Sequence, residues 1–214
     1  MNRRIALATL FTVLFATSAC GAGETQPAPK TVLSIASGPT ESLTLGGGCF
    51  WCLEAVYREL RGVTKVESGY AGGNAEDPDY AAVSSGTTGH AEVVDVTFDP
   101  KQVSRDDILH VYFTIHDPTT KDRQGADVGT QYRSVAFWRT PEQKAAIEKA
   151  IADVAASGEY ANPVVTQVVP FTKFWPAEDY HQQYFELHGE EPYCSLVIAP
   201  KIAKFRKKFA ALLR

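Results

Sequence analysis

The sequence has few cysteines, no excess of positive charge and no apolar run long enough to span a membrane. Four cysteines among 214 residues are too few for the dense disulfide framework of a small secreted scaffold. A formal net charge of -4 provides no basic field for nucleic acid, so no nucleic-acid partner is expected. The uncharged run near the start, Ile5 to Ala19, is too short to cross a bilayer comfortably. What remains is a globular chain of ordinary composition, long enough for one substantial domain.

The residues needed for a metal or phosphate site are also missing. Cys49 and Cys52 have the spacing of zinc ligands, but no second Cys/His pair follows and the five histidines are scattered. The glycine triplet Gly46-Gly47-Gly48 lacks the Lys and Ser/Thr that a phosphate-binding loop requires. We therefore expect no metal and no cofactor.

Residues 1–20 have the layout of a bacterial export signal, with a basic start, a short apolar core and a small-residue exit. Their last four residues, Thr17-Ser18-Ala19-Cys20, resemble a lipobox, whose cysteine receives lipid in bacterial lipoproteins. We expect a lipoprotein-type signal that is cleaved before Cys20, with the mature protein anchored by lipid in the cell envelope or periplasm. Simple secretion is the competing prediction, and the lipid anchor is the only membrane contact expected.

The rest of the chain divides into a tether and one domain. Residues 21–40 are rich in Gly, Ala, Pro, Ser and Thr without a sustained period, which predicts a flexible tether. The folded domain is predicted from 41 to 214, with strands and helices that do not alternate regularly, and this favours an α+β fold. Periodicity and capping residues predict strands near 42–45, 63–73, 91–98, 130–138 and 164–169, helices near 50–60, 104–115, 140–156, 176–188 and 201–209, and an extended segment at 193–198.

Cys49 stands between the glycine triplet and the first predicted helix. The residues after it have helical spacing, so Cys49 should lie at or next to a helix N-terminus. The partial positive charge there stabilises a thiolate and can lower a cysteine pKa from about 8.5 toward neutrality. Phe50 and Trp51 add an apolar, aromatic wall, which suits a small apolar group next to an electrophilic centre. The alternative is an ordinary buried cysteine beside a turn.

Glu92 is the candidate acid. Strict alternation in the strand 91–98 puts Glu92 on the same face as Val94, Val96 and Phe98. An apolar surface disfavours the charged form of a carboxyl, so its pKa should rise and it could remain protonated as a general acid. The alternative is that Glu92 lies at the end of the strand and reaches water.

Five short motifs occur in order along the chain. They are Gly48-Cys49-Phe50-Trp51, Gly69-Tyr70-Ala71-Gly72-Gly73, Gly89-His90-Ala91-Glu92-Val93, Gly129-Thr130-Gln131-Tyr132-Arg133-Ser134 and His181-Gln182-Gln183-Tyr184. Together they resemble the class A peptide-methionine sulfoxide reductases, over a stretch from about Leu43 to Cys194. The resemblance implies a two-layer α+β fold of ferredoxin-like character, with helices packed on a mixed sheet. It also implies thiol-dependent reduction of the S epimer of methionine sulfoxide, free or in oxidised proteins.

The resemblance carries roles for individual residues. It implies that Cys49 attacks the sulfoxide sulfur and becomes a sulfenic acid, while Glu92 supplies a proton to the oxygen. Tyr80 and Tyr132 match the hydroxyls that hold that oxygen, and Asp127 matches an acidic residue that lines the site. The expected outcome is repair of oxidative damage.

Two further roles follow from the same resemblance. Phe50 and Trp51 match the wall that packs on the substrate methyl group. Cys194 lies near the position of the family's usual resolving cysteine and is favoured over Cys52, which is one helical turn from Cys49 but also belongs to an apolar stripe. A thioredoxin-like protein is the expected reductant.

Two other classes of function could start from the same cysteines. A general dithiol oxidoreductase would use the C-x-x-C motif formed by Cys49 and Cys52. A non-enzymatic metal-binding module would use both cysteines and a histidine. Neither class explains the accompanying tyrosines and glutamate.

Overall fold

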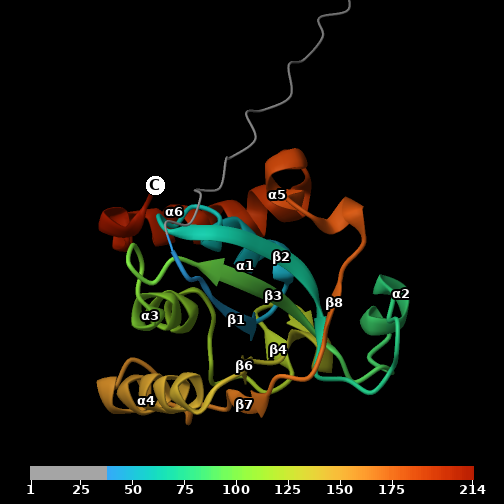
Figure 1. The fold of residues 1–214 in the computed structure, drawn as a ribbon. Helices are drawn as coiled ribbons and strands as arrows, with labels where there is room; N and C mark the ends of the chain where they lie inside the picture. The colour runs from blue at the N-terminus through green and yellow to red at the C-terminus, as the bar shows by residue number, and fades with distance from the viewer. Residues whose placement is uncertain (1–37) are drawn as a thin grey trace, which may run out of the picture.

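A six-stranded mixed sheet forms the centre of the molecule (Figure 1). The computed structural model describes residues 38–214. In spatial order the strands are β7 (Gln167–Pro170), β6 (Val135–Trp138), β1 (Glu41–Gly46), β3 (Ala91–Phe98), β2 (Val63–Ala71) and β8 (Phe174–Pro176). Strands β6 and β7 pair in parallel, and the other neighbours in this sheet pair antiparallel. The predicted export signal, Cys20 and positions 21–37 of the predicted tether lie outside the described residues.

Helices pack around this sheet. They are α1 (Phe50–Tyr57), α2 (Tyr80–Ser84), α3 (Arg105–Ile115), α4 (Pro141–Ser157), α5 (Tyr184–Leu187) and α6 (Ala199–Lys208), and a small hairpin is formed by β4 (Arg123–Gln124) and β5 (Asp127–Val128). Helix α1 packs on β2 and β3, α6 packs on α1 and α3, and α4 covers the end of the sheet at β6 and β7 (Figure 1). The prediction of an α+β domain with a mixed sheet is therefore confirmed, while its ferredoxin-like detail stays a prediction.

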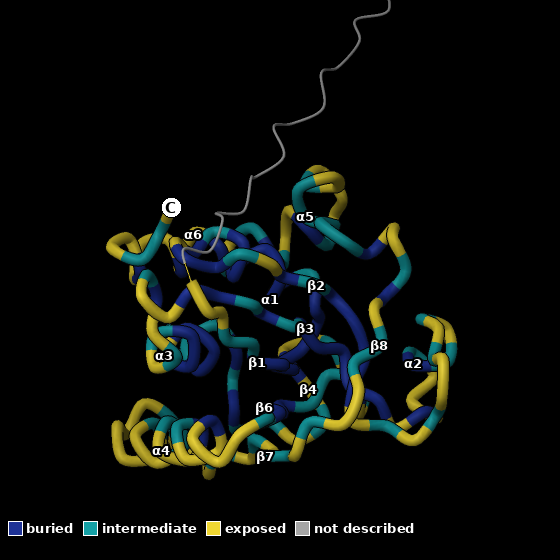
Figure 2. Tube along the Cα trace, in the orientation of Figure 1, coloured by how far each residue is buried: buried dark blue, intermediate teal, exposed yellow. Residues whose placement is uncertain are grey.

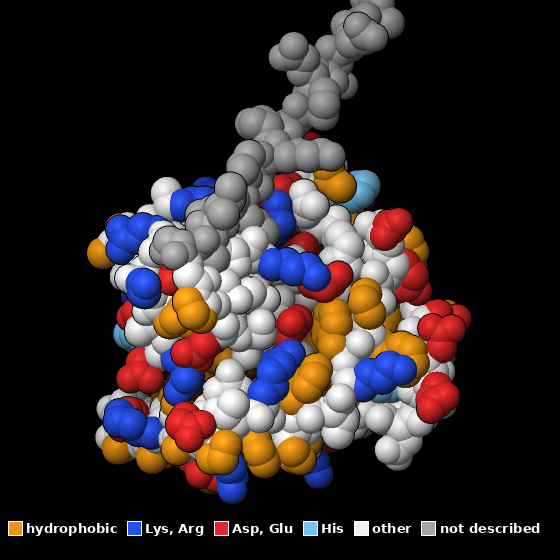
Figure 3. All heavy atoms as spheres, viewed as in Figure 1, with side chains coloured by type: hydrophobic (Ala, Val, Ile, Leu, Met, Phe, Trp, Pro, Cys, Tyr) orange, Lys and Arg blue, Asp and Glu red, His pale blue; other side chains and the backbone are white. Residues whose placement is uncertain are grey.

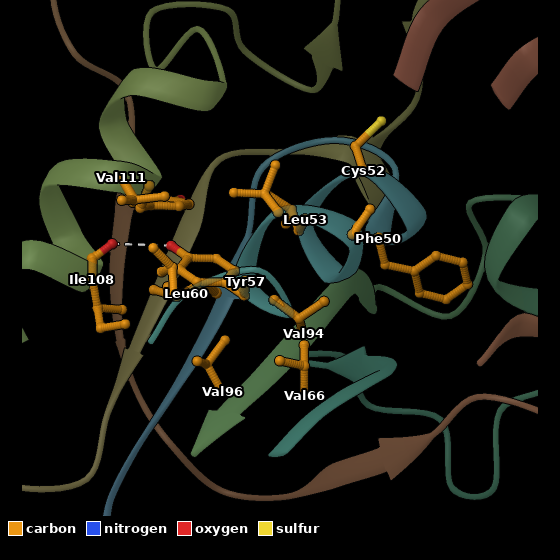
Figure 4. Close-up of a cluster of buried hydrophobic side chains, with 14 of the residues drawn as sticks. Phe50, Cys52, Leu53, Tyr57, Leu60, Val66, Val94, Val96, Ile108 and Val111 are labelled. Atoms are coloured by element: carbon orange, nitrogen blue, oxygen red, sulfur yellow. Dashed lines mark hydrogen bonds between the residues drawn. The ribbon is translucent and has the colours of Figure 1, made fainter. Parts of the chain in front are cut away.

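Strand β3 explains where the core lies. Its alternate residues Val94 and Val96 join the main buried cluster with α1, and Val93 joins a smaller buried cluster on the other face of the sheet. Figure 4 shows the Tyr57 hydroxyl of α1 directed toward α3, where it donates to the Ile108 carbonyl oxygen at 3.0 Å. Figure 2 shows β2, β3 and α1 as largely buried, whereas α4 turns an exposed side outward. The first four residues of β3, Ala91 to Val94, are all buried, so the Glu92 side chain is held out of water, whereas Asp95 and Thr97 are half-buried.

The helix ends follow the predicted capping residues. Ser104 and Asp107 form a reciprocal capping box at the start of α3. Thr140 caps α4, Pro141 takes its first turn, and Gly158 closes it in the left-handed conformation at φ 71°. The strand predicted at 91–98 is also found with those bounds.

Three predicted elements are wrong. Positions 130–132 of the strand predicted at 130–138 form a 3-10 turn, so that strand begins only at Val135. The helix predicted at 176–188 is interrupted, because Pro176 ends strand β8, which pairs with β2, and because Gln183 takes a left-handed φ of 56° before α5. The segment predicted as extended, Cys194–Ile198, is a π-helical turn that runs into α6.

Two structural features bear on partners. Within 38–214, no helix combines the length and the apolar character needed to cross a membrane. On the face shown in Figure 3, acidic and basic side chains are interspersed and neither sign gathers into a single field.

Candidate active site

The glycine triplet places Cys49 at the start of α1. A side chain at Gly46 would meet the Glu92 carbonyl oxygen and a Val135 methyl, each at 2.9 Å, so only glycine allows this approach to β3 and β6. Gly48 has a φ of 95°, which other residues rarely adopt. Cys49 then serves as the N-cap residue of α1, as the sequence predicts.

A cavity of about 230 Å³ opens beside the Cys49 thiol. It is lined by Cys49, Phe50, Trp51, Tyr80, Glu92, Asp127, Tyr132 and Tyr193. The structure thus brings together the predicted nucleophile, acid, hydroxyls, acidic residue and aromatic wall from segments that are far apart in the chain. Cys52 and Cys194 are not among the lining residues, and Tyr193 is a lining residue that the motifs do not single out.

Glu92 is buried at the edge of this cavity. Only 2% of its surface is exposed, so it does not reach bulk water as the alternative reading of a strand-end carboxylate requires. Its Oε2 atom accepts a hydrogen bond from the Phe50 backbone N–H at 3.1 Å. Burial raises the pKa of Glu92 to about 8, so the carboxyl holds a proton at neutral pH.

Two tyrosine hydroxyls face the same space. Burial and the nearby Glu92 raise the pKa of Tyr80 and of Tyr132, so both hydroxyls remain hydrogen-bond donors. The position of Tyr80 is fixed by its backbone N–H, which donates to Glu178 Oε1 at 2.8 Å. Glu178 also accepts from the Tyr70 hydroxyl at 2.9 Å, and the Tyr80 ring lies 4.4 Å from the His181 ring.

The aromatic wall is held by a buried histidine. Trp51 Nε1 donates to His181 Nδ1 at 3.2 Å, and the indole stacks on the Tyr184 ring at 3.7 Å between centroids. The Phe50 ring lies 5.1 Å from the His181 ring. Burial lowers the pKa of His181, so the ring stays neutral and its Nδ1 can accept. Phe50 and Trp51 are therefore held in fixed orientations at the cavity.

Tyr193 connects the cavity to the C-terminal part of the chain. Its hydroxyl donates to Asp127 Oδ2 at 2.8 Å and lies within hydrogen-bonding contact of Cys49. Its ring meets Trp51 edge-on at 5.9 Å. The signal in the sequence that could have identified it is its position directly before Cys194.

Comparisons with known proteins agree with this geometry. The family model described as Peptide methionine sulfoxide reductase matches residues 41–213. The chain belongs to this family of enzymes. It is 53% identical over 173 residues to the peptide methionine sulfoxide reductase MsrA of Polynucleobacter asymbioticus. This alignment covers 81% of this chain and 91% of that protein. It is 51% identical over 176 residues to the MsrA of Thermus thermophilus, covering 82% and 99%.

Solved structures give the same assignment. The reduced form of Mxr1 from Saccharomyces cerevisiae aligns with a TM-score of 0.69 and 31% identity, covering 76% of this chain and 93% of that chain. Methionine sulfoxide reductase A of Corynebacterium diphtheriae aligns with a TM-score of 0.65 and 34% identity, covering 76% and 82%. The prediction of the class A reductase family is confirmed.

The thiols of this reductase lie in contrasting environments. Burial raises the pKa of the Cys49 thiol, and contact with Cys52 and the nearby Glu92 raise it further. The expectation that the helix start lowers this pKa is therefore wrong, and burial is the largest cause of the rise. The hydrogen bond from Cys49 lowers the pKa of Cys52, as does the Lys201 ammonium, whose Nζ donates to the Cys52 sulfur at 3.8 Å. The pKa values of these two neighbouring thiols therefore shift in opposite directions.

Cys194 does not line the cavity. It is fully buried in the π-helical turn, is a free thiol like Cys49 and Cys52, and interacts electrostatically with Cys52. In residues 38–214, no group of three or more His, Cys, Asp or Glu side chains is arranged to hold a metal ion.

Proposed function

We propose that this protein reduces the S epimer of methionine sulfoxide, free or in oxidised proteins, back to methionine through a Cys49 sulfenic acid. One observation carries the proposal: the Cys49 sulfur and the protonated, buried Glu92 line a single cavity that Phe50 and Trp51 wall on its apolar side. A sulfoxide presents an electrophilic sulfur, a basic oxygen and an apolar methyl, and the cavity offers a complementary group to each.

The reaction then proceeds in a balanced sequence. The Cys49 sulfur bonds to the sulfoxide sulfur, and Glu92 transfers its proton to the oxygen as negative charge develops there. The Tyr80 and Tyr132 hydroxyls donate to that oxygen. The hydroxyl then moves from the substrate sulfur to the Cys49 sulfur, so that the substrate sulfur–oxygen bond and the sulfur–sulfur bond break while a bond between the Cys49 sulfur and the oxygen forms. Methionine leaves, and Cys49 is a sulfenic acid. The substrate sulfur gains two electrons and the Cys49 sulfur loses two.

Selection of one epimer follows from three fixed contacts. A sulfoxide sulfur is pyramidal, so its methyl group, oxygen and chain occupy distinct directions. When the Phe50 and Trp51 wall takes the methyl and Glu92 takes the oxygen, only one hand of the sulfoxide turns its sulfur toward Cys49. The class A resemblance indicates that this hand is S.

Regeneration is proposed to use Cys194. Its thiol displaces hydroxide from the Cys49 sulfenic acid, forming a disulfide and water, and a thioredoxin-like dithiol then reduces that disulfide. The π-helical turn that carries Cys194 supports this role, because such turns are rare and occur frequently at functional sites. Mass spectrometry after one turnover should show a bridge between Cys49 and Cys194. A bridge between Cys49 and Cys52, or a persistent sulfenic acid, would contradict it.

We place the reaction in the cell envelope, where the enzyme repairs oxidised proteins while anchored through lipid on Cys20. The export signal predicted at residues 1–20 and the resemblance of Thr17-Ser18-Ala19-Cys20 to a lipobox support this placement. Metabolic labelling with a fatty acid should mark the protein and should not mark a Cys20→Ser variant. Equal labelling of both proteins, or of neither, would exclude the lipid anchor.

An assay with resolved epimers tests the activity. Dabsylated methionine S-sulfoxide should be reduced in the presence of dithiothreitol, and Cys49→Ser should abolish the product. The R epimer serves as the matched control and should not be turned over. Absence of turnover of the S epimer, or undiminished turnover by Cys49→Ser, would refute the proposal.

A further inference from the structure

The side chains of Cys49, Cys52 and Lys201 form a row, in which Cys49 lines the cavity and Cys52 does not. Lys201 on α6 donates to the Cys52 sulfur at 3.8 Å, and Cys52 is in hydrogen-bonding contact with Cys49. Cys52 is only 7% exposed, so little water competes for these contacts. The row joins residues 149 positions apart in the chain.

Helix geometry brings the two sulfurs together. Cys49 is the N-cap residue of α1, and the Cys52 backbone N–H donates to the Cys49 carbonyl oxygen at 3.1 Å, which closes the first turn. Figure 4 shows the Cys52 sulfur directed away from Val66 and Val94, the side chains on which α1 packs. Cys52 is therefore buried, but its sulfur is not directed into the apolar contact between helix and sheet.

The positive charge of Lys201 favours a thiolate at Cys52, at the end of the row away from the substrate. The charged and titratable groups that face Cys52 are Cys49 at the start of α1, Glu92 on β3, Asp127 on β5, Tyr193 and Cys194 around the π-helical turn, and Lys201 on α6. Among these, the Lys201 ammonium supplies positive charge, whereas Asp127 opposes a negative sulfur at Cys52. The contact with Cys49 and the Lys201 charge together outweigh burial and Asp127.

We propose that Cys52, paired with Lys201, is the base that takes the Cys49 proton as Cys49 attacks the sulfoxide. This inference rests on the proposed function and adds a catalytic residue to it. Lys201 is a positioning residue, because it acts through Cys52. The role is distinct from that of a resolving thiol, because Cys52 acts while the first bond to the substrate forms, before any sulfenic acid exists.

The proton transfers balance. Before the attack, Cys49 carries a proton, Cys52 is a thiolate and Glu92 is a neutral acid. As the sulfur–sulfur bond forms, the Cys49 proton passes to Cys52 and the Glu92 proton passes to the sulfoxide oxygen. Release of methionine leaves Cys49 as a sulfenic acid, Cys52 as a thiol and Glu92 as a carboxylate. A proton returned from Cys52 to Glu92, through solvent or the site, restores the resting charges.

The electrostatics explain why a separate base is needed. Burial raises the pKa of Cys49, so this thiol does not ionise readily by itself at neutral pH. A thiolate is the reactive nucleophile. The neighbouring Cys52 is available as a thiolate because its own pKa is lowered, and the Lys201 ammonium lies 3.8 Å from its sulfur.

The test is the rate of methionine formation in the first turnover, measured by rapid quench with the S epimer and without reductant. For Cys52→Ser, this rate at neutral pH should fall about 100-fold, at the lower end of the contribution of a positioned base. The acidic limb of its pH profile should also move to higher pH, because Cys49 must then ionise unaided. Circular dichroism and thermal unfolding establish that the variant is folded, and Cys52→Ala provides a second variant without a hydroxyl.

Variants of Lys201 test the positioning role without changing a thiol. Lys201→Met should slow the first turnover about 10-fold at neutral pH, because one unit of pKa corresponds to a tenfold change in the thiolate fraction. Lys201→Arg retains the charge and should restore most of the rate and the pH profile. Lys204→Met is the matched control, since it removes an exposed lysine of the same helix, and its rate should equal that of the wild type.

Each outcome is informative. If the wild type forms no methionine, the proposed function itself fails. If the wild type forms methionine and folded Cys52→Ser matches its rate and pH profile, the base assignment is overturned. A normal first turnover in Cys52→Ser followed by a block in later turnovers would also overturn it, and would identify Cys52 as a resolving thiol. Equal profiles for Lys201→Met and the wild type would remove Lys201 from the mechanism.

Discussion

The two sides of the Cys49 sulfur are built differently. On the oxygen side, Glu92 on β3 and the hydroxyls of Tyr80 and Tyr132 are neutral groups whose pKa values are raised chiefly by burial. On the thiol side, Cys52 has a lowered pKa, set by its contact with Cys49 and by the charge of Lys201. Glu92 lies on β3, Tyr80 on α2 and Tyr132 in a 3-10 turn, whereas Cys52 lies on helix α1 and Lys201 on helix α6.

The contrast shows how a single buried site can both donate and accept protons at one pH. Burial alone raises the pKa of a carboxyl and of a thiol, so it provides an acid but no base. At Cys52 the contact with Cys49 and, after it, the Lys201 cation outweigh burial, while the Glu92 carboxyl stays protonated. We infer that protons reach the substrate oxygen from Glu92 and leave Cys49 toward Cys52.

Removal of the acid should produce the largest effect on this contrast. Glu92→Gln retains the size of the side chain but cannot transfer a proton, so the first-turnover rate at neutral pH should fall about 1,000-fold. Rapid-quench measurement of methionine is the readout. The matched control is Glu67→Gln on β2, which removes a partly exposed carboxylate paired with Lys65. A rate within a few-fold of the wild type in Glu92→Gln would remove Glu92 as the acid.

A smaller effect is expected from loosening the aromatic wall. Trp51→Phe removes the hydrogen bond to His181 and should raise KM about 10-fold, the cost of roughly one net hydrogen bond. The value of kcat should change less, because the reacting groups remain. Trp138→Phe is the control, since its Nε1 has no hydrogen-bond partner within the described residues. An equal change in both variants would mean that the wall does not depend on His181.

The smallest effect on catalysis is expected at Glu54, a second buried carboxyl that does not line the cavity. Its oxygens accept from the Gln183 backbone N–H at 2.9 Å, and burial raises its pKa to about 7. The unfolded chain ionises Glu54 at lower pH than the folded protein does, so this group makes the wild type less stable as pH rises toward 7. In the wild type, this ionisation should lower the free energy of unfolding by about 2 kcal/mol between about pH 5 and about pH 8. Glu54→Gln should lack this decline.

Urea unfolding at both pH values measures this difference. Glu148→Gln, an exposed carboxylate paired with Lys144 on α4, should leave the pH dependence unchanged. The first-turnover rate of Glu54→Gln should stay near that of the wild type. A loss of rate as large as that of Glu92→Gln would show that burial, rather than position in the cavity, decides the role of a carboxyl.

The elements that were predictable are those fixed by local pattern. Strict alternation in β3 predicts both the strand and the buried side of Glu92, because a two-residue period has only two faces. Capping residues predict the ends of α3 and α4. The motif residues predict most of the cavity lining, because each motif carries a side chain that the sheet and turns bring to one place.

The remaining features depend on contacts between distant segments. The pattern at 176–188 favours a helix, but pairing of β8 with β2 and the left-handed Gln183 override it. The raised pKa of Cys49 follows from burial by segments that no local pattern locates. The contact of Lys201 with Cys52 joins two helices that are far apart in the sequence.

The most direct test of the proton path is the pH profile of the first turnover in the wild type. If protonated Glu92 delivers the proton, the rate of methionine formation should fall as pH rises through about 8, where this carboxyl loses its proton, although thiols become more ionised over the same range. Glu92→Gln should lack this alkaline decline. A wild-type rate that continues to rise above this pH, parallel to thiol ionisation, would contradict the account.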